Sequence, residues 1–233
     1  MFHLHVDLVN LTRKSCAFHK AWGSFTLVGR AIVSADPGCH TTEGCVVVRS
    51  MAFVPLDPNP PKRLARVMLR YARRKYGDLQ PVAAAANHVG VLMANGAIET
   101  VVEKRWKVLD PHLKWLAVQA SATAIGCSWC TDFGYYLGVN EGIDPRKVTD
   151  VPRWRDSDVY DAKERLVLEY AERATATPAD VDDDLNARLS VHFDVEERVE
   201  LAAWVALESY RSRFNAGLGL VSQGFSASCA VPA

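Results

Sequence analysis

The chain of 233 residues is long enough for one or two compact domains with a substantial hydrophobic core. Hydrophobic residues make up 49% of the chain and charged residues 23%, which is typical of a globular protein and excludes wholesale disorder. The 27 Lys and Arg residues balance the 27 Asp and Glu residues, so no overall positive field attracts nucleic acid, and we expect no nucleic-acid partner.

The distribution of polar residues argues against membrane insertion and secretion. No stretch of the sequence approaches the roughly 18 to 20 consecutive apolar residues of a membrane-spanning helix. At the N-terminus, His3, Asp7 and Arg13 stand where a secretory signal needs its apolar segment. We therefore expect a cytoplasmic protein without a membrane partner, in which the six cysteines stay reduced unless they carry out redox chemistry.

Residues 1–50 differ from the rest of the chain. They show neither a sustained helical period nor clean strand alternation, although short runs such as 24–33 and 45–48 could form strands. They contain zinc-binding residue types without the paired spacing of a structural zinc site, as at Cys39, His40 and Cys45. We expect an irregular extension over 1–50, and Met51 is a candidate for the natural start of the protein.

Residues 51–233 are predicted to form one all-α domain. After Pro60, apolar residues recur on one helical face from 64 to 71, which predicts a helix over 60–76 that ends at Gly77. Further helices are predicted, in chain order, over 82–94, 98–108, 112–125, 128–137, 159–175, 179–189 and 195–218. Because strand and helix patterns do not alternate, the sequence favours a helical bundle over a parallel sheet.

Capping residues mark several of these boundaries. Asp110 and Pro111 together make a helix start, and Gly126 can end the following helix in a left-handed conformation. We expect Asp180 to open the helix over 179–189 and Asp194 to cap the last helix, because negative charge complements the helix dipole there. These acidic residues therefore need no functional explanation.

Cys127 and Cys130 form a CxxC pair at the predicted N-terminus of the helix over 128–137. Two cysteines on one helical turn lie on the same face and can close a small disulfide ring. The free N–H groups and the dipole at this end of a helix favour thiolate over thiol. A thiolate beside a second thiol can reduce a peroxide. Its attack gives a sulfenic acid, the second thiol converts this to a disulfide, and an external dithiol resets the pair.

Two other interpretations of the pair remain open on the sequence alone. A single CxxC can be half of a zinc site, although this region offers only Cys229 and scattered histidines as further ligands. Buried thiols can also serve as small apolar residues, and the neighbouring Trp129 and Phe133 fit such packing. Redox CxxC motifs usually belong to a thioredoxin fold, whose βαβ context is missing here.

The region around the pair resembles the AhpD-like, carboxymuconolactone decarboxylase family. The resemblance is carried by residues 109–130 (LDPHLKWLAVQASATAIGCSWC), where a helix and a glycine precede the CxxC. The long predicted helix at 199–215 (VELAAWVALESYRSRFN) supports it. The resemblance covers roughly residues 60 to 225 and leaves the first fifty residues untouched.

The resemblance implies an all-α fold, a homo-oligomer of three or more copies, and alkylhydroperoxidase or peroxiredoxin-type activity without a cofactor or metal. The partners would be a peroxide substrate and a dithiol reductant. In family members that keep both cysteines, the second attacks the peroxide, which implies that Cys130 is peroxidatic and Cys127 resolving. The helix dipole by itself favours Cys127, which is nearer the helix start.

The chain departs from the family pattern at the proton relay. Peroxidase members place a histidine four residues after the second cysteine and a glutamate about twelve before the first, and these positions are Gly134 and Trp115 here. General acid–base help is worth about 10²- to 10⁴-fold, so its loss predicts weak peroxidase turnover.

Other ionisable residues are candidates to replace this relay. Asp132 follows Cys130 by two residues, a spacing at which helical side chains do not face each other, so we expect it to be solvated. Residues that could approach from other helices are His88, Glu103, His112 and Lys114. Arg213, near Asn215, is expected to hold a carboxylate or to pair with Glu208.

Two further functions stay open. The decarboxylase members of the family use no cysteine pair and bind a lactone carboxylate with histidines and basic residues, and no such histidine cluster is evident here. A non-catalytic oligomer whose thiols sense oxidation and whose surface binds a partner is the alternative from a different class.

Overall fold

The computed structural model describes residues 52–229, so the predictions for residues 1–50 lie outside the described part of the chain. Regular secondary structure within 52–229 is entirely helical, as predicted. The α-helices are α1 (Arg63–Tyr76), α2 (Gln80–Ala85), α3 (Val89–Arg105), α4 (Pro111–Ile125), α5 (Ser128–Asn140), α6 (Pro145–Asp150), α7 (Ala162–Thr175), α8 (Asp183–His192) and α9 (Val195–Gly217). Two 3-10 turns are η1 (Val151–Arg153) and η2 (Ser226–Cys229).

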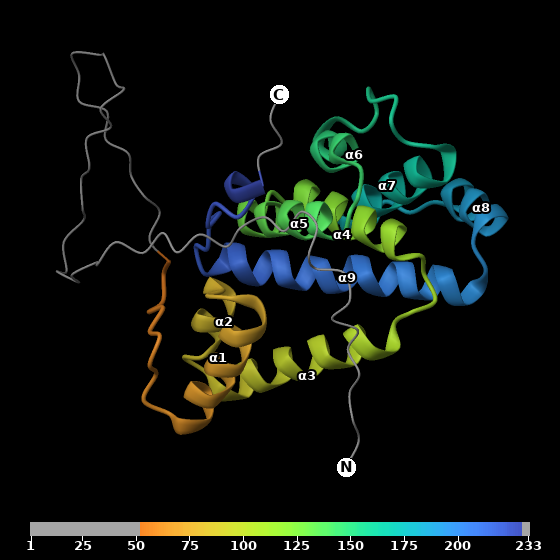
Figure 1. Cartoon of the computed structure of the whole chain (residues 1–233). Coiled ribbons are helices and arrows are strands. Elements are labelled where there is room, and N and C mark those ends of the chain that lie inside the picture. The colour runs from red at the N-terminus through yellow and green to blue at the C-terminus, as the bar shows by residue number, and fades with distance from the viewer. Residues whose placement is uncertain (1–51, 230–233) are drawn as a thin grey trace, which may run out of the picture.

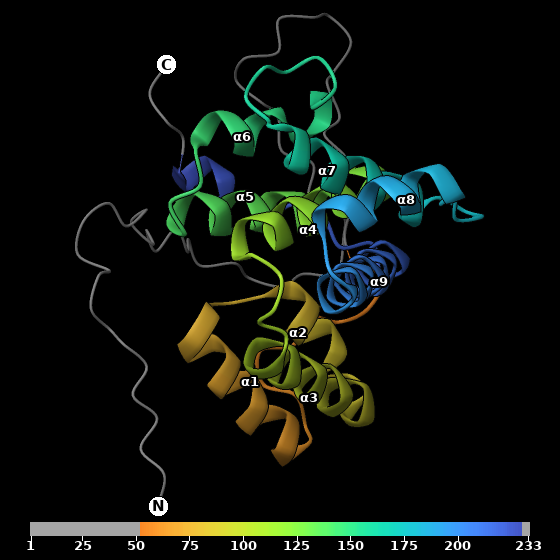
Figure 2. The ribbon, with the colours of Figure 1, turned by 90° about the vertical axis from the view of Figure 1, so that its right-hand side faces the viewer.

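The long helix α9 lies at the centre of the molecule. Helices α1, α2 and α3 gather on one side of it, and α4 to α8 lie on the other, as both views show (Figures 1 and 2). The main core lies between α4, α7 and α9, where Leu116, Val167, Leu168 and Leu201 are almost wholly buried. A smaller cluster joins α1, α2 and α3 to Phe214 of α9. Helix α9 therefore contributes to the packing on both of its sides.

Side-chain caps explain why several helices begin where they do. Asp161 and Asp194 each accept a hydrogen bond from the backbone three residues on, and Glu164 and Glu197 return one, which makes a capping box at the start of α7 and α9. Asp110 caps α4, and Gly126 ends it with a left-handed φ of 79°. The caps predicted at Asp110, Gly126 and Asp194 are thus confirmed.

Two predicted helix boundaries near the start of the domain are wrong. The predicted break between 82–94 and 98–108 is absent, because α3 continues through Gly96, and a single helical glycine costs only about 1 kcal/mol. The chain instead breaks at His88, whose Nδ1 accepts a hydrogen bond of 3.2 Å from the Val91 N–H and caps α3.

Three later boundaries also differ from the prediction. Helix α8 begins after Asp182, which accepts the Leu185 N–H at 2.9 Å, while Asp180 bonds Arg173 instead of opening the helix. Helix α5 passes Gly138, where a Cβ atom would lie 2.7 Å from the Trp115 ring, so the missing side chain allows close packing inside a helix. Helix α6 and η1 lie in a region left without a predicted element.

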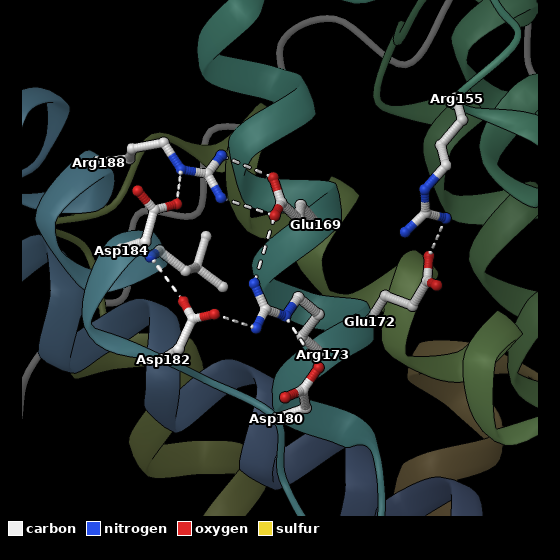
Figure 3. A network of polar contacts seen from close by, with 9 residues as sticks. Arg155, Glu169, Glu172, Arg173, Asp180, Asp182, Asp184 and Arg188 are labelled. Carbon is white, nitrogen blue, oxygen red and sulfur yellow. Dashed lines mark hydrogen bonds and ion pairs between the residues drawn. The ribbon is translucent and has the colours of Figure 1, made fainter.

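A network of ion pairs fastens α8 and its preceding loop to α7 (Figure 3). Arg173 of α7 bonds Asp180 at 3.2 Å and Asp182 at 2.7 Å. Arg188 of α8 bonds Glu169 of α7 at 2.7 Å and Asp184 at 2.9 Å. Such exposed or half-exposed pairs are each worth about 1 kcal/mol or less, so the network mainly sets the position of α8.

Neither a membrane-spanning helix nor a metal-binding cluster is found over residues 52–229. No helix there is both long and apolar enough to cross a bilayer. The same residues contain no group of three or more His, Cys, Asp or Glu side chains arranged to hold a metal ion.

Candidate active site at Cys127 and Cys130

Cys127 and Cys130 come together where α4 ends and α5 begins. The left-handed turn at Gly126 directs the chain into α5, and Cys127 is the N-cap residue, whose Sγ accepts the Cys130 N–H at 3.2 Å. The two residues form a disulfide with their Cα atoms 5.3 Å apart. Both are buried, with exposed fractions of 2% and 8%. The CxxC pair therefore lies at a helix N-terminus, as the sequence predicts, and is present in its oxidised form.

Polar side chains of α9 face the two sulfur atoms. Ser212 places its hydroxyl oxygen 3.4 Å from the Sγ of Cys130. Asn215 directs its amide Nδ2 to the same Sγ at 3.3 Å and lies 4.0 Å from the Sγ of Cys127. Both polar side chains are buried, with exposed fractions of 0% and 2%. The Asn215 amide is a hydrogen-bond donor beside the sulfur and stabilises a thiolate there, so this contact fits a reactive cysteine better than an inert apolar one.

A buried glutamate continues this polar row along α9. The Ser212 hydroxyl donates to Glu208 Oε1 at 2.7 Å, and Arg211 lies 3.5 Å from the other carboxylate oxygen. Arg211 is itself held by two hydrogen bonds to Glu99 of α3. Burial raises the pKa of Glu208 to about 7, although Arg211 and the Ser212 hydroxyl oppose the shift. At neutral pH this carboxyl group can therefore both accept and donate a proton.

Residues 221–226, here called the C-terminal strap, cross over α5 and are anchored by Asp132. The Oδ2 of Asp132 accepts the Ser222 hydroxyl and the N–H groups of Gln223, Gly224 and Phe225, at 2.8 to 3.0 Å. Its Oδ1 accepts the Ser226 N–H at 2.8 Å. Burial by itself would raise the pKa of Asp132, but the hydrogen bonds from Ser226, Ser222 and Phe225 hold it below its ordinary value.

The expectation that Asp132 is solvated is therefore wrong. The residue is buried, with an exposed fraction of 6%. The spacing argument shows only that Asp132 and Cys130 point to different sides of α5, and it says nothing about what covers the other side. That side is covered by the C-terminal strap, whose residues bonded to Asp132 lie 90 to 94 positions further along the chain.

The strap also closes over the start of α5 and the junction between α1 and α2. The Oε1 of Gln223 accepts the Trp129 indole N–H at 2.7 Å and the Gln80 N–H at 3.0 Å. Phe225 packs against Trp129 and Phe133, with ring centroids 6.1 and 5.2 Å apart. The cysteines consequently have an apolar lining on this side and a polar one on the side of α9.

The two relay positions of the family, Trp115 and Gly134, contact each other. The Trp115 indole N–H donates to the carbonyl oxygen of Gly134 at 3.0 Å. A Cβ atom at Gly134 would overlap the side-chain oxygen of Gln119, whose amide donates to the Thr131 carbonyl at 3.0 Å. The space that an imidazole and a carboxylate would need is therefore filled by Trp115 and Gln119.

The other relay candidates lie in contacts between helices or at their ends. His88 caps α3, and the Nε2 of His112 lies 2.7 Å from Glu164. The ammonium of Lys114 lies 5.5 Å from the centroid of the Trp204 ring, and Glu103 accepts the Tyr76 hydroxyl at 3.4 Å. Arg213 bonds the carbonyl oxygen of Thr175 and the hydroxyl of Thr177, so the expected pairing of Arg213 with Glu208 is wrong. Arg211 is the arginine that pairs with Glu208.

Sequence reasoning missed Ser212, assigned no role to Asn215 and considered Glu208 only as a partner of Arg213. A signal was present, because the three residues follow the i, i+4, i+7 spacing of one helical face. They are polar on a face of α9 that turns towards the protein interior, where Leu207 and Val205 are also buried. A buried polar row of this kind in a long helix indicates a site rather than a core.

Comparison with known proteins agrees with this architecture. The model of the carboxymuconolactone decarboxylase family matches residues 93–173. The uncharacterized protein YnjA of Escherichia coli (strain K12) is 32% identical over 161 residues, which are 69% of this chain and 87% of YnjA.

Two crystal structures share the fold. The debrominase Bmp8 has a TM-score of 0.63 at 22% identity, and the match covers 72% of this chain and 94% of the Bmp8 chain. An uncharacterized peroxidase-related protein with an alkylhydroperoxidase AhpD core, from Ralstonia eutropha JMP134, has a TM-score of 0.63 at 19% identity and covers 77% of this chain and 100% of its own. The sequence match to YnjA, the family model and the common helical fold show that the chain belongs to the AhpD-like, carboxymuconolactone decarboxylase family.

Proposed function

We propose that this protein is a peroxiredoxin-type thiol peroxidase that reduces a peroxide with Cys127 and Cys130 and is reset by an external dithiol. The observation that carries the proposal is the contact of the Cys130 sulfur with Ser212 and Asn215, next to a CxxC disulfide at a helix N-terminus. A merely structural thiol pair has no need for two buried polar side chains directed at its sulfur.

The proposed reaction consumes one peroxide for each disulfide formed. The Cys130 thiolate attacks the peroxide, an S–O bond forms, the O–O bond breaks, and the leaving alkoxide takes up a proton to become an alcohol. The Cys127 thiol then attacks the sulfur of the sulfenic acid, a disulfide forms, and hydroxide leaves as water after gaining the thiol proton. Two electrons from an external dithiol return both cysteines to thiols by thiol–disulfide exchange.

The roles of the two cysteines follow their different surroundings. Cys130 contacts both polar side chains of α9, which favours it as the attacking residue. Cys127 is the more buried of the two and accepts the Cys130 N–H, which keeps its sulfur close to that of Cys130 and suits a resolving thiol. The helix dipole favours Cys127 instead, so the experiment below uses both single variants.

The apolar lining of the site favours an organic hydroperoxide. Leu79, Trp129, Phe133 and Phe225 pack in the cluster that contains the cysteines, and apolar side chains of this kind contact an alkyl or aryl group more favourably than a polar one. We therefore expect a higher kcat/KM for cumene hydroperoxide than for hydrogen peroxide.

The second candidate function is redox sensing, which the burial of the pair favours, with Phe225 of the C-terminal strap packed against the cluster that contains both cysteines. A sensor forms one disulfide per subunit and recycles slowly, whereas a catalyst consumes many equivalents of peroxide. Bmp8 is a debrominase on the same fold, so reductive debromination by the dithiol belongs among the reactions to be assayed.

The test is a turnover assay of the full chain with dithiothreitol and cumene hydroperoxide. We expect many equivalents of peroxide to be consumed per subunit, with loss of this activity in Cys130→Ser. In Cys127→Ser a single oxidation of Cys130 is expected, followed by stalling or over-oxidation. Stoichiometric consumption that ends after one equivalent would support the sensor, and full activity of Cys130→Ser would overturn the site assignment.

The family resemblance also leads us to propose a homo-oligomer of three or more copies. Light scattering coupled to size-exclusion chromatography gives the mass directly, and a monomer at micromolar concentration would contradict the proposal.

A further inference from the structure

We propose that Glu208 and Ser212 of α9 form the proton relay of the Cys130 site and replace the relay that the family places on α4 and α5. The inference rests on the proposed thiol chemistry but concerns different residues, and it is tested below by a readout that requires no peroxide.

The geometry connects the carboxyl group to the sulfur through one hydroxyl. Ser212 Oγ lies 2.7 Å from Glu208 Oε1 and 3.4 Å from Cys130 Sγ. A hydroxyl group can accept one proton while it donates another, so this single side chain suffices to move a proton between carboxyl and thiol. All three residues are buried, with exposed fractions of 3%, 0% and 8% for Glu208, Ser212 and Cys130, so water competes little for these contacts.

Burial raises the pKa of Glu208, and the neighbouring charges act on it in both directions. Arg211, on the same helix, approaches the carboxylate at 3.5 Å and favours the charged form. Glu99 of α3 bonds the same guanidinium and opposes that effect, and Cys130 of α5 lies on the Ser212 side of the group. Burial then raises the pKa of Glu208 to about 7, the range in which a carboxyl group can serve as both base and acid.

The relay supplies both proton transfers of the first chemical step, the removal of the thiol proton and the protonation of the leaving alkoxide. Glu208, as carboxylate, takes up the Cys130 thiol proton through Ser212 and leaves a thiolate. When the thiolate attacks the peroxide and the O–O bond breaks, the same proton returns through Ser212 to the departing alkoxide. Glu208 ends the step as it began, and no further acid or base is required.

The occupied family positions strengthen the assignment. Trp115 and Gln119 fill the space beside Gly134, on the side of α5 towards α4. The described part of the chain therefore keeps a carboxyl group near the peroxidatic sulfur, but it supplies that group from α9.

The test compares Glu208→Gln with a matched control, Glu200→Gln. Glu200 is a second buried glutamate of α9, and its carboxylate bonds the Val108 N–H at 2.8 Å and the Trp204 indole at 3.2 Å. Two quantities are measured for the reduced full-length protein from pH 5 to pH 9. The first is the rate of Cys130 alkylation by iodoacetamide, followed by peptide mass spectrometry, and the second is kcat/KM for cumene hydroperoxide.

In the wild type we expect both quantities to show an inflection near pH 7 that arises from Glu208. Glu208→Gln should lose this inflection and lower kcat/KM at neutral pH by about 10²-fold or more, whereas Glu200→Gln should keep the wild-type profile. Ser212→Ala, which breaks the connection and leaves the carboxyl group in place, should give the same loss. Thermal unfolding of each variant shows whether it folds. If Glu208→Gln does not fold, Ser212→Ala serves as the test in its place.

The outcomes separate this inference from the proposed function. If Glu208→Gln and Ser212→Ala keep the wild-type profiles and rates, the relay is overturned while the peroxidase assignment stands. If the wild type consumes no peroxide, the peroxidase assignment fails, and the alkylation profile still decides the relay. An alkylation profile that changes equally in Glu200→Gln would also contradict the relay, because it would reflect a general disturbance of α9.

Discussion

Trp115 donates its indole N–H to the carbonyl oxygen of Gly134, 3.0 Å away, and thereby joins the two positions at which peroxidase members of the family carry their relay. The contact replaces a polar pair by an aromatic ring packed over α5. Gly138, one turn further on, accommodates the same ring because it has no Cβ atom. The Trp115 ring therefore fits against both glycines, and the family's two relay positions are filled by this packing.

The first prediction concerns restoring the family histidine. Gly134→His should destabilise the protein by about 1 to 3 kcal/mol and should not raise turnover, because its Cβ atom would overlap the side chain of Gln119. Urea denaturation measures the loss. Gly134→His combined with Gln119→Ala should recover part of the stability, and a fully stable, more active Gly134→His protein would contradict this account of the packing.

The second prediction uses the pH dependence of stability. Burial raises the pKa of Glu208 to about 7 in the folded protein, so the folded state binds its proton more tightly than the unfolded chain does. The stabilisation of the folded state that results from this tighter proton binding is fully present below the unfolded pKa of about 4.3 and is lost as the pH rises through 7. Relative to that of Glu208→Gln, the free energy of unfolding of the wild type should therefore fall by roughly 3 kcal/mol between pH 4 and pH 8, at about 1.4 kcal/mol per pKa unit.

Urea denaturation of both proteins across this range checks the sign and the size. Glu200→Gln again serves as the control for the loss of a buried carboxylate and its hydrogen bonds on α9. A difference between wild type and Glu208→Gln that does not change with pH would exclude a raised pKa at Glu208.

The third prediction concerns the anchor of the C-terminal strap. Asp132→Ala removes the acceptor of five hydrogen bonds and should release residues 221–226 from α5, at a cost of about 2 to 3 kcal/mol. Amide hydrogen exchange at Gln223, Gly224 and Phe225 should speed up, and reduced Cys130 should be alkylated faster because Phe225 no longer packs against the cluster that contains it. Asp158→Asn, at an exposed aspartate, is the control.

The same anchor predicts an effect of acid. The pKa of Asp132 is lowered in the folded protein, so its stabilisation is present above the unfolded pKa of about 3.9 and is lost as the pH falls further. Exchange of the strap amides should therefore increase towards acid pH relative to that of core amides in α4. Equal acceleration in both places would mean that the strap opens only with global unfolding.

The fourth prediction concerns the contact between Asn215 and the sulfur of Cys130. Asn215→Ala removes a buried amide that donates to this Sγ at 3.3 Å, so the thiolate loses a hydrogen bond. Cys130 alkylation at neutral pH should slow by about tenfold, since a hydrogen bond to a charged group is worth about 1.5 to 3 kcal/mol. The pH of the inflection assigned to Glu208 should stay in place, which distinguishes a loss of thiolate stabilisation from a loss of the relay.

Much of the fold follows from local features of the sequence. Asp110 with Pro111, and Asp194, start helices because a carboxylate satisfies free N–H groups of its own helix, within three residues. Gly126 ends α4 because it adopts a positive φ without strain, and this places Cys127 at the start of the next helix. Where the sequence misled, as at Asp180 and Gly96, each residue can take more than one local role, and its neighbours in space select between them.

The sequence by itself thus determined the all-α class, most helix positions and the CxxC pair at a helix N-terminus, because these depend on residues close together along the chain. Only the tertiary structure decided what faces the sulfur atoms. Ser212 is 82 residues from Cys130, and Ser226 is 94 residues from Asp132, so both contacts depend on how α9 and the C-terminal strap pack against α5. The spacing of Glu208, Ser212 and Asn215 shows that they share one face of α9, but packing between helices arises from the sum of many weak apolar contacts, so the sequence does not show which element that face meets.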